Sequence, residues 1–107
     1  IVDFSRLIAI DSRSAKAYIG RGRSKYQLQD YSGAIADYRK ALSIDPQYAS
    51  AYFNLGLVKA KSQDLKGAIS DMQQAAKLYQ QQDKLQAAKD AIAQIAKWKQ
   101  TQNNSGF

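Results

Sequence analysis

The sequence of 107 residues contains no cysteine and no histidine, and all nine of its acidic residues are aspartate. Without cysteine there is no disulfide framework, and without cysteine and histidine there is no zinc site of the usual type. The same absences exclude a thiol nucleophile, a catalytic triad with histidine and a histidine proton switch near neutral pH.

Long apolar runs and proline are also scarce. No run approaches the ~20 apolar residues with which a helix spans a bilayer, so we expect no membrane partner. One proline and six glycines favour helix. A composition with 45% hydrophobic and 23% charged residues is that of an ordinary globular domain. The lack of cysteine is compatible with a reducing compartment such as the cytoplasm.

The strongest pattern is an internal repeat of 34 residues. Residues 11–44 and 45–78 share 13 identities in 34 positions, where ordinary composition gives roughly two or three. The shared positions include Asp11/Asp45, Tyr18/Tyr52, Gly22/Gly56, Lys25/Lys59, Asp30/Asp64, the block Gly33-Ala34-Ile35 with Gly67-Ala68-Ile69, and Asp37/Asp71. A period of this length marks an array in which each unit is too small to bury its own apolar face.

Within each unit the apolar residues have helical spacing and form two stripes, one on each side of a turn at Gln29-Asp30. Asp30 and Asp64 stand where a short carboxylate can cap the following helix. Gly22 and Gly56 lower the helix propensity of their segments. We therefore expect another helix to approach closely at these two positions. The unit is therefore predicted to be an antiparallel helix pair, and the chain an all-α solenoid of about six helices.

A helix-turn-helix repeat of this kind resembles the tetratricopeptide repeat (TPR), whose pattern is W-x2-L-G-x2-Y, then A-x3-F, then A and P. The first full unit matches with Tyr18-x2-Arg21-Gly22, Ala34-x3-Tyr38, Ala41 and Pro46, and the second with Tyr52-x2-Leu55-Gly56, Ala68-x3-Met72 and Ala75. The chain departs from the pattern at Arg21, where Leu is usual, and at Lys25 and Lys59, where Tyr is usual. Gln80 replaces the closing Pro of the second unit.

The register of the repeat predicts how the chain is divided. Residues 1–10 align with the second half of a unit, so we expect the second helix of a truncated repeat there. Repeat 1 then covers 11–44 and repeat 2 covers 45–82. Residues 83–100 are expected to form a capping helix that begins at Asp83, and residues 101–107 a flexible tail.

No pattern of catalytic residues emerges from the aspartates. Seven of the nine recur at offsets of 34 residues, and a residue repeated in each unit is suited to building the unit. We therefore expect no enzyme, no cofactor and no metal site. Lys25 with Asp37, and Lys59 with Asp71, have the same separation of 12 residues, which suggests an ion pair that bridges the two helices of each unit.

Positive charge is concentrated in the predicted first helices. Segments 12–29 and 46–63 together carry seven Lys or Arg and no acid, against +7 for the whole chain. In arrays similar to TPR proteins, first helices line a concave groove. The resemblance implies that the groove side includes Lys16, Ile19, Arg23, Tyr26, Gln27, Ser50, Phe53, Asn54, Leu57 and Lys61, together with Gly20 and Ala60.

The favoured function is a protein–protein interaction module that binds a partner peptide or helix, with a leaning towards acidic ligands. Some TPR domains clamp a C-terminal carboxylate, but only Asn54 and Lys84 match part of that pattern. One alternative is a helical repeat that binds RNA or another nucleic acid, which a pI near 9.7 permits although the acids are interspersed. Another is self-association through Phe4, Leu7 and Ile8, whose stripe lacks a partner helix.

Overall fold

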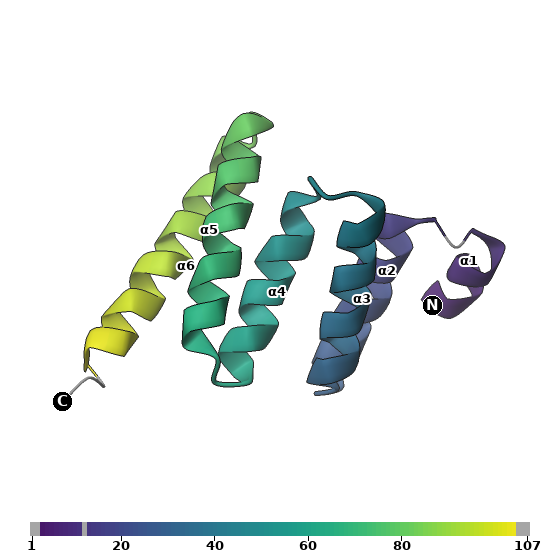
Figure 1. The fold of residues 1–107 in the computed structure, drawn as a ribbon, viewed down its shortest axis with the longest axis horizontal. Coiled ribbons are helices and arrows are strands. Elements are labelled where there is room, and N and C mark those ends of the chain that lie inside the picture. Colours follow the sequence, from purple (N-terminus) through teal and green to yellow (C-terminus); the bar gives the residue numbers. More distant parts are fainter. Residues whose placement is uncertain (1–2, 12, 105–107) are drawn as a thin grey trace.

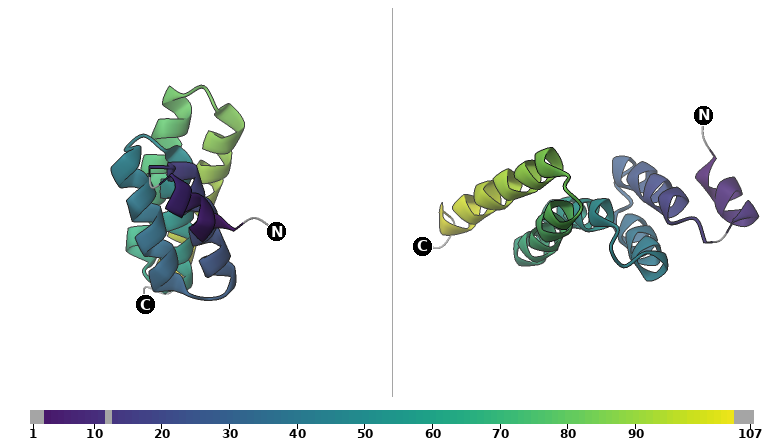
Figure 2. Two further views of the ribbon diagram at one scale, coloured as in Figure 1. Left: turned by 90° about the vertical axis from the view of Figure 1, so that its right-hand side faces the viewer. Right: turned by 90° about the horizontal axis from the view of Figure 1, so that it is seen from above.

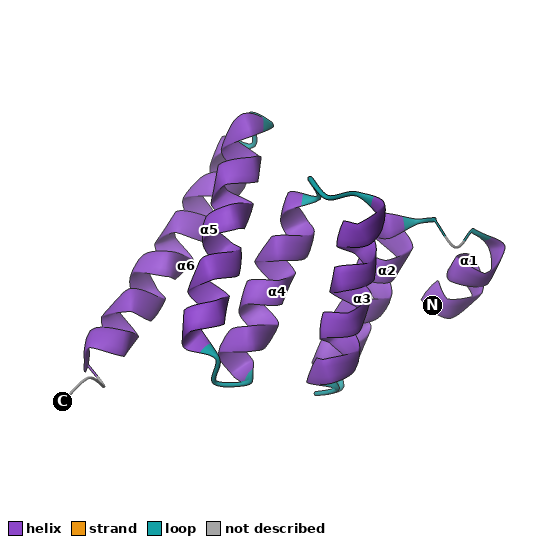
Figure 3. Cartoon of the chain, viewed as in Figure 1, coloured by secondary structure: helices purple, strands orange, loops and turns teal. Residues whose placement is uncertain are grey.

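The structure is a computed structural model that describes residues 3–11 and 13–104. Within these residues all regular structure is helical, and the helices follow one another along an elongated body of 50 × 31 × 23 Å (Figures 1 and 3). They are α1 (Phe4–Ile10), α2 (Ala15–Gln27), α3 (Tyr31–Ile44), α4 (Ala49–Lys61), α5 (Leu65–Gln81) and α6 (Leu85–Asn104). The predicted all-α solenoid of about six helices is confirmed. None of these helices is long and apolar enough to cross a membrane.

The helices pack as consecutive pairs. α2 lies against α3, α4 against α5 and α5 against α6, while α3 and α4 join the two repeats. α2 also contacts α4 directly. Seen from above, the helices alternate between the two sides of the body, with α3 and α5 on the side away from α2 and α6 (Figure 2). The side formed by α2 and α4 is therefore the surface on which the predicted groove must lie.

The two predicted aspartate caps are present. Asp30 Oδ1 accepts a hydrogen bond from the Gly33 amide at 3.1 Å, and Asp64 Oδ1 accepts one from the Gly67 amide at 3.0 Å. Each cap follows a glutamine with positive φ, which reverses the chain direction in a short turn. The same local chemistry therefore ends the first helix and begins the second in both repeats.

The third turn differs from the prediction that Asp83 caps the last helix. Asp83 itself has the positive φ, at 58°, and thus occupies the turn position of the earlier glutamines. Lys84 follows it, and the Lys84 carbonyl accepts from the Ala88 amide as the Asp30 carbonyl accepts from Ala34. The aspartate is one residue too early to act as the cap, because aspartate also tolerates the left-handed conformation that the turn requires.

The mid-helix glycines allow the close approach that the sequence predicts. A Cβ atom on Gly22 would lie 2.6 Å from the Tyr38 ring, and one on Gly56 would lie 3.0 Å from the Ala68 carbonyl oxygen. At Gly22 a Cβ would force the Tyr38 ring to move, and at Gly56 it would be a tight contact with the backbone of α5. The lower helix propensity of glycine is thus offset by the tight packing of α2 on α3 and of α4 on α5.

The interior consists of two apolar clusters that meet at α4. One joins α2, α3 and α4 around Tyr38 and Leu55, and the other joins α5 and α6 around Met72 and Trp98. Side chains on the opposite faces of α4 contact both clusters. α4 is therefore the helix that binds the two halves of the array together.

The two end helices differ in how they are attached. α1 contributes no buried residue, whereas α6 buries Ala88, Ala91 and Trp98. α6 continues to Asn104, so residues 101–104 are helical and do not belong to the predicted tail. Thr101 Oγ1 donates to the Lys97 carbonyl at 3.1 Å within this last turn. Residues 105–107 lie outside the described residues, and the repeat boundaries stay an interpretation of the register.

Candidate functional site

Three adjoining hollows follow the side of the molecule formed by α2 and α4. The central hollow, of about 390 Å³, is lined by Phe4, Lys16, Ile19, Gly20, Arg23, Tyr48, Ser50, Phe53 and Asn54. The lower hollow, of about 180 Å³, is lined by Arg23, Tyr26, Gln27, Tyr38, Asn54 and Leu57. The upper hollow, of about 530 Å³, is lined by Asp45, Gln47, Tyr48, Ala49, Ser50, Tyr79, Gln82 and Lys84. Neighbouring hollows share wall residues, and we call the three together the groove.

The structure brings nine of the ten predicted groove residues to this surface. They are Lys16, Ile19, Arg23, Tyr26, Gln27, Ser50, Phe53, Asn54 and Leu57. Lys61 is exposed at the end of α4 and lines none of the three hollows. Ala60 packs against the cluster of α5 and α6 instead of facing the groove. Both lie in the last turn of α4.

The apolar members of the groove are anchored in the core. Ile19 is buried, and Phe53 and Leu57 are half-buried against the cluster of α5 and α6. The Phe53 ring meets the Tyr79 ring edge-on, with 6.4 Å between the ring centres. Such contacts restrict the side chains before any ligand arrives, so the groove offers a preformed apolar floor.

Buried Tyr38 and half-buried Tyr79 contribute to the groove without being predicted from the sequence. Tyr38 reaches the lower hollow from α3, and burial raises the pKa of its hydroxyl to about 12. Tyr79 reaches the upper hollow from α5, and burial, with a smaller effect of Tyr48, raises its pKa as well. Both are therefore neutral hydroxyl groups at physiological pH, able to donate or accept a hydrogen bond.

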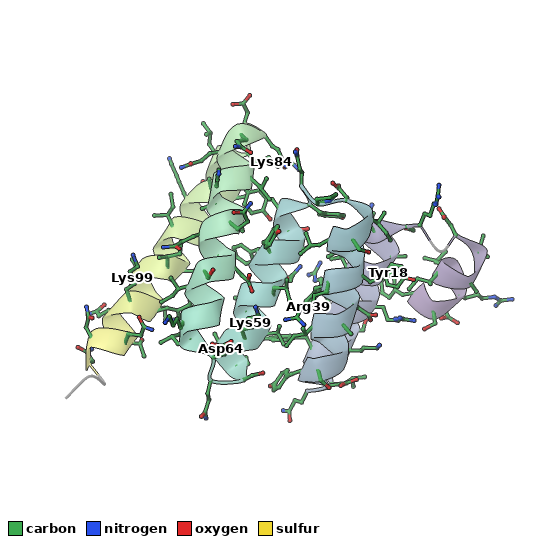
Figure 4. All side chains as sticks on the ribbon, viewed as in Figure 1. Tyr18, Arg39, Lys59, Asp64, Lys84 and Lys99 are labelled. Carbon is green, nitrogen blue, oxygen red and sulfur yellow. The ribbon has the colours of Figure 1, made fainter. Side chains whose placement is uncertain are left out.

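The upper hollow depends on a contact between two turns. Gln82 Nε2, in the α5–α6 turn, donates to the Gln47 carbonyl in the α3–α4 turn at 2.8 Å. Lys84 lines the same hollow and lies beside the upper part of α5 (Figure 4). Gln47 and Gln82 are 35 positions apart in the chain, and no periodic signal in the sequence connects them.

Four charged side chains line the three hollows. Lys16 and Arg23 are exposed at the central hollow, and Lys84 is exposed at the upper one. Asp45 is the acidic side chain among the lining residues of the three hollows. A ligand that lies along the groove would thus meet three cations and one carboxylate.

Other cations of α2 face into the repeat. Arg21 donates to both carboxylate oxygens of Asp37, from Nε at 2.9 Å and from Nη2 at 2.8 Å, and Lys25 Nζ lies 3.2 Å from Oδ2. Burial alone would raise the pKa of Asp37, but the hydrogen bonds from Arg21 and Lys25 outweigh it and lower the pKa. The Arg21 pKa is raised by the same hydrogen bond to Asp37.

The second repeat has the same kind of ion pair between its two helices, but with one cation instead of two. Lys59 Nζ lies 2.7 Å from Asp71 Oδ2, while Leu55 occupies the position that corresponds to Arg21. The predicted ion pair between the helices of each repeat is therefore confirmed in both repeats. Because Arg21, Lys25 and Lys59 are paired inside the repeats, less of the positive charge of the first helices reaches the groove than the sequence alone suggests.

One further hollow lies away from the groove. It has a volume of about 550 Å³ and is lined by Arg13, Tyr18, Lys40, Ser43 and Ile44, from the start of α2 and the end of α3. Among residues 3–11 and 13–104, no group of three or more acidic side chains could hold a metal ion.

Two protein-family models match this chain. A model described as "TPR repeat" matches residues 22–63, and one described as "Tetratricopeptide repeat" matches residues 49–80. Together they span 22–80, which is more than half of the chain.

The chain belongs to the tetratricopeptide repeat family. No curated protein sequence matches it significantly.

Solved structures of TPR proteins superpose closely on this chain. The TPR2B domain of yeast Sti1, in complex with a peptide of Hsp70, has a TM-score of 0.86 and 20% identity, and the match covers 92% of this chain and 78% of that one. PcrH, in complex with the chaperone binding region of PopD, has a TM-score of 0.87 and 23% identity over 92% and 75%. The TPR domain of Arabidopsis OM64 has a TM-score of 0.75 and 26% identity over 88% and 75%. These TPR proteins share the helical solenoid, and two of them are bound to protein segments.

Proposed function

We propose that this TPR domain binds a segment of a partner protein in the groove, and that acidic segments with one or two apolar side chains are preferred. The observation that carries the proposal is the continuity of the three hollows along α2 and α4. A continuous trough of this kind fits a linear chain better than a compact small molecule. The bound segments of the Sti1 and PcrH structures support the same class of ligand.

The floor of the groove supports the apolar part of the proposal. Phe53, Leu57 and Ile19 offer carbon surface whose positions are set by packing on the core. Transfer of a ligand leucine from water to such a surface contributes about 1.5–3 kcal/mol when burial is complete. One or two such anchors would account for most of the affinity of a short segment.

The cations at the rim of the groove support the proposed preference for acidic segments. Lys16 and Arg23 are exposed on the same face of α2, and Arg23 borders both the central and the lower hollow. Exposed cations of this kind mainly speed the encounter with an oppositely charged ligand and orient it. Asn54, opposite Arg23 on α4, can both donate to and accept from a peptide backbone.

The first prediction concerns Arg23. The probes are two pools of fluorescent eight-residue peptides with the same leucine and isoleucine positions, one rich in aspartate and one with asparagine instead. Fluorescence anisotropy should show tighter binding of the acidic pool, and Arg23→Ala should weaken that binding by about fivefold, since one exposed ion pair contributes up to about 1 kcal/mol. The neutral pool should change little.

Lys61→Ala is the matched control for Arg23→Ala, because it also removes one exposed cation but lies outside the groove. Equal effects of the two variants would mean that only net charge matters, and the groove assignment would be wrong. Steep loss of binding to single-stranded RNA with rising salt, with neither peptide pool bound, would favour nucleic acid as the ligand.

A further inference from the structure

One polar group in the lower hollow, the hydroxyl of Tyr38, belongs to an almost completely buried side chain. Tyr38 reaches the hollow from α3, and only 1% of the residue is exposed. Among residues 3–11 and 13–104, no side chain or backbone group forms a hydrogen bond with this hydroxyl. The hydroxyl oxygen is not sealed off, because Tyr38 forms part of the wall of the hollow. Buried hydroxyl groups normally have a partner, so this one is available to a ligand.

The fold does not require this hydroxyl. Phenylalanine is usual at the corresponding position of the TPR pattern, and Met72 occupies that position in the second repeat. Tyr38 and Met72 are both fully buried in their apolar clusters, so carbon atoms are enough to fill the position. The hydroxyl of Tyr38 is therefore an addition to the packing of the first repeat.

The packing of α2 on α3 directs the Tyr38 ring towards the groove. α3 lies on the side of the body away from α2 (Figure 2), so the ring must pass α2 to reach the lower hollow. It passes at Gly22, where an added Cβ would lie 2.6 Å from Cε1, next to the carbon that carries the hydroxyl. Asn54 and Leu57 of α4 form the opposite wall. A ligand in the groove must therefore extend a group between α2 and α4 to meet the hydroxyl.

The charges around the hydroxyl favour a ligand group that accepts hydrogen bonds. Arg23 is the charged side chain among the residues that line the lower hollow. Burial raises the pKa of Tyr38 to about 12, although the positive charge of Arg23 opposes the rise. At neutral pH the hydroxyl thus keeps a proton to donate, and the guanidinium group of Arg23 only donates. Two donors with one positive charge suit a carboxylate.

The carboxylate of Asp37, the residue before Tyr38, does not fill this role. Arg21 donates to both of its oxygens, and Lys25 Nζ lies 3.2 Å from Oδ2. Asp37 is also not among the residues that line the lower hollow. Because two cations compensate its charge, Asp37 opposes a ligand carboxylate in the hollow only weakly.

The other walls of the lower hollow fit a side chain with an apolar stem. Leu57 and Tyr26 are half-buried there and offer carbon surface. The Tyr26 ring packs against the Tyr31 ring, whose centre lies 5.7 Å away. The hollow has a volume of about 180 Å³, which suits one side chain. Glutamate carries its carboxylate on two methylene groups and aspartate on one, so glutamate reaches further between the two helices.

We propose that the lower hollow is a specificity pocket for a glutamate side chain of the bound segment, an inference that rests on the proposed function of the groove. The glutamate carboxylate accepts a hydrogen bond from the Tyr38 hydroxyl and pairs with Arg23, while its methylene groups lie against Leu57. The amide of Asn54 can donate to the same carboxylate. The pocket thus adds a preference for glutamate over aspartate and glutamine to the general preference for acidic segments.

Binding of three peptide pools tests the proposal. The fluorescent eight-residue peptides share their leucine and isoleucine positions and carry glutamate, aspartate or glutamine at the others. By fluorescence anisotropy, the wild-type chain should bind the glutamate pool about tenfold more tightly than either other pool, the size expected for one hydrogen bond to a charged group. Tyr38→Phe should remove this advantage and change the binding of the aspartate pool little.

Two further variants separate the hydroxyl from other effects. Tyr31→Phe is the matched control, because it removes a hydroxyl from the same helix but Tyr31 lines none of the three hollows. This variant should keep the tenfold advantage of the glutamate pool. Arg23→Ala should weaken binding of the glutamate and aspartate pools alike, since Arg23 also borders the central hollow.

Thermal unfolding of Tyr38→Phe shows whether the hydroxyl has a structural role. The midpoint of the variant should equal or exceed that of the wild type, because the hydroxyl is buried without a hydrogen bond in the free protein. A lower midpoint would mean that the hydroxyl stabilises the repeat itself, and the proposal would be wrong.

The outcomes for the pocket and for the groove are distinguishable. Equal binding of the glutamate and aspartate pools by the wild type, or an advantage that Tyr38→Phe retains, would overturn the pocket and leave the groove in place. Equal binding of the glutamate and glutamine pools would show that a carboxylate is not what the pocket selects, and would overturn it too. If the wild type bound none of the pools, the proposed function of the groove would fail, and the pocket with it.

Discussion

At the scale of single residues, the most concentrated charge of the interior lies between α2 and α3. The buried Asp37 carboxylate meets two cations that are each about one-third exposed. Arg21 takes the place of the leucine usual in the family, so that an apolar contact is replaced by a two-point hydrogen bond. We therefore expect Asp37 to stabilise the first repeat more than Asp71 stabilises the second.

The second prediction is that Asp37→Asn lowers the free energy of unfolding at pH 7 by about 1–3 kcal/mol. This is less than for a fully buried pair, because Arg21 and Lys25 keep contact with water. Urea denaturation gives the value. Asp71→Asn is the control and should cost less, since Asp71 has one cationic partner. A larger cost at Asp71 would contradict the role given to Arg21.

The third prediction concerns pH and follows from the lowered pKa of Asp37. A carboxyl group whose pKa is lower in the folded state stabilises the fold above its ordinary pKa of 3.8, and this contribution is lost as pH falls through the folded-state value. The stability gap between wild type and Asp37→Asn should therefore be constant from pH 5 to 7 and shrink below pH 4. A gap unchanged at pH 2.5 would show that charge is not its source.

At the scale of helices, turns with almost the same backbone connect α2 to α3, α4 to α5 and α5 to α6. In each, one residue has positive φ, and the next amide donates back to the carbonyl five residues earlier. The third turn alone has lysine instead of aspartate before the following helix. α6 therefore begins without the side-chain cap that α3 and α5 have.

The fourth prediction is that Lys84→Asp stabilises the chain by about 0.5–1 kcal/mol, because aspartate can accept from a free amide of the first turn and also suits the helix dipole. Thermal unfolding followed by circular dichroism should show a higher midpoint. Lys84→Ala removes the same positive charge without supplying an acceptor, so an equal gain in this variant would rule out capping as the cause.

At the scale of the whole molecule, stability should be uneven along the solenoid. In a repeat array each helix is stabilised by its immediate neighbours. α4 packs against α3, α5 and α2, whereas α1 contacts mainly α2 and buries none of its residues. Within the described residues, we therefore expect α1 to open most easily.

The fifth prediction is that amide hydrogen exchange is fastest in α1 among the six helices and slowest in α4 and α5. Mass spectrometry of peptides from dilute protein measures this order. Equal protection of α1 and α4 in dilute protein would contradict the proposed gradient.

Much of the architecture could be predicted from local patterns. The 34-residue period, the caps at Asp30 and Asp64 and the two Lys–Asp bridges depend on spacing within one repeat, where helical geometry relates neighbours directly. Two local predictions were wrong. Asp83 was expected to cap the last helix but occupies the turn, because aspartate suits both positions. The tail was expected to begin at residue 101, but α6 continues to Asn104.

The sequence by itself determined the repeat, the helix pairs and the residue types on each face, because these follow from periodicity along a single helix. Only the tertiary structure decided that Arg21 joins Lys25 on the Asp37 carboxylate and that Lys61 lies outside the groove. Arg21, Lys25 and Lys59 turn inward to carboxylates of the neighbouring helix, while Lys16 and Arg23 stay exposed. It also decided that Tyr38 and Tyr79 line the groove, since contacts between separate helices depend on how the helices pack and not on the spacing within either one.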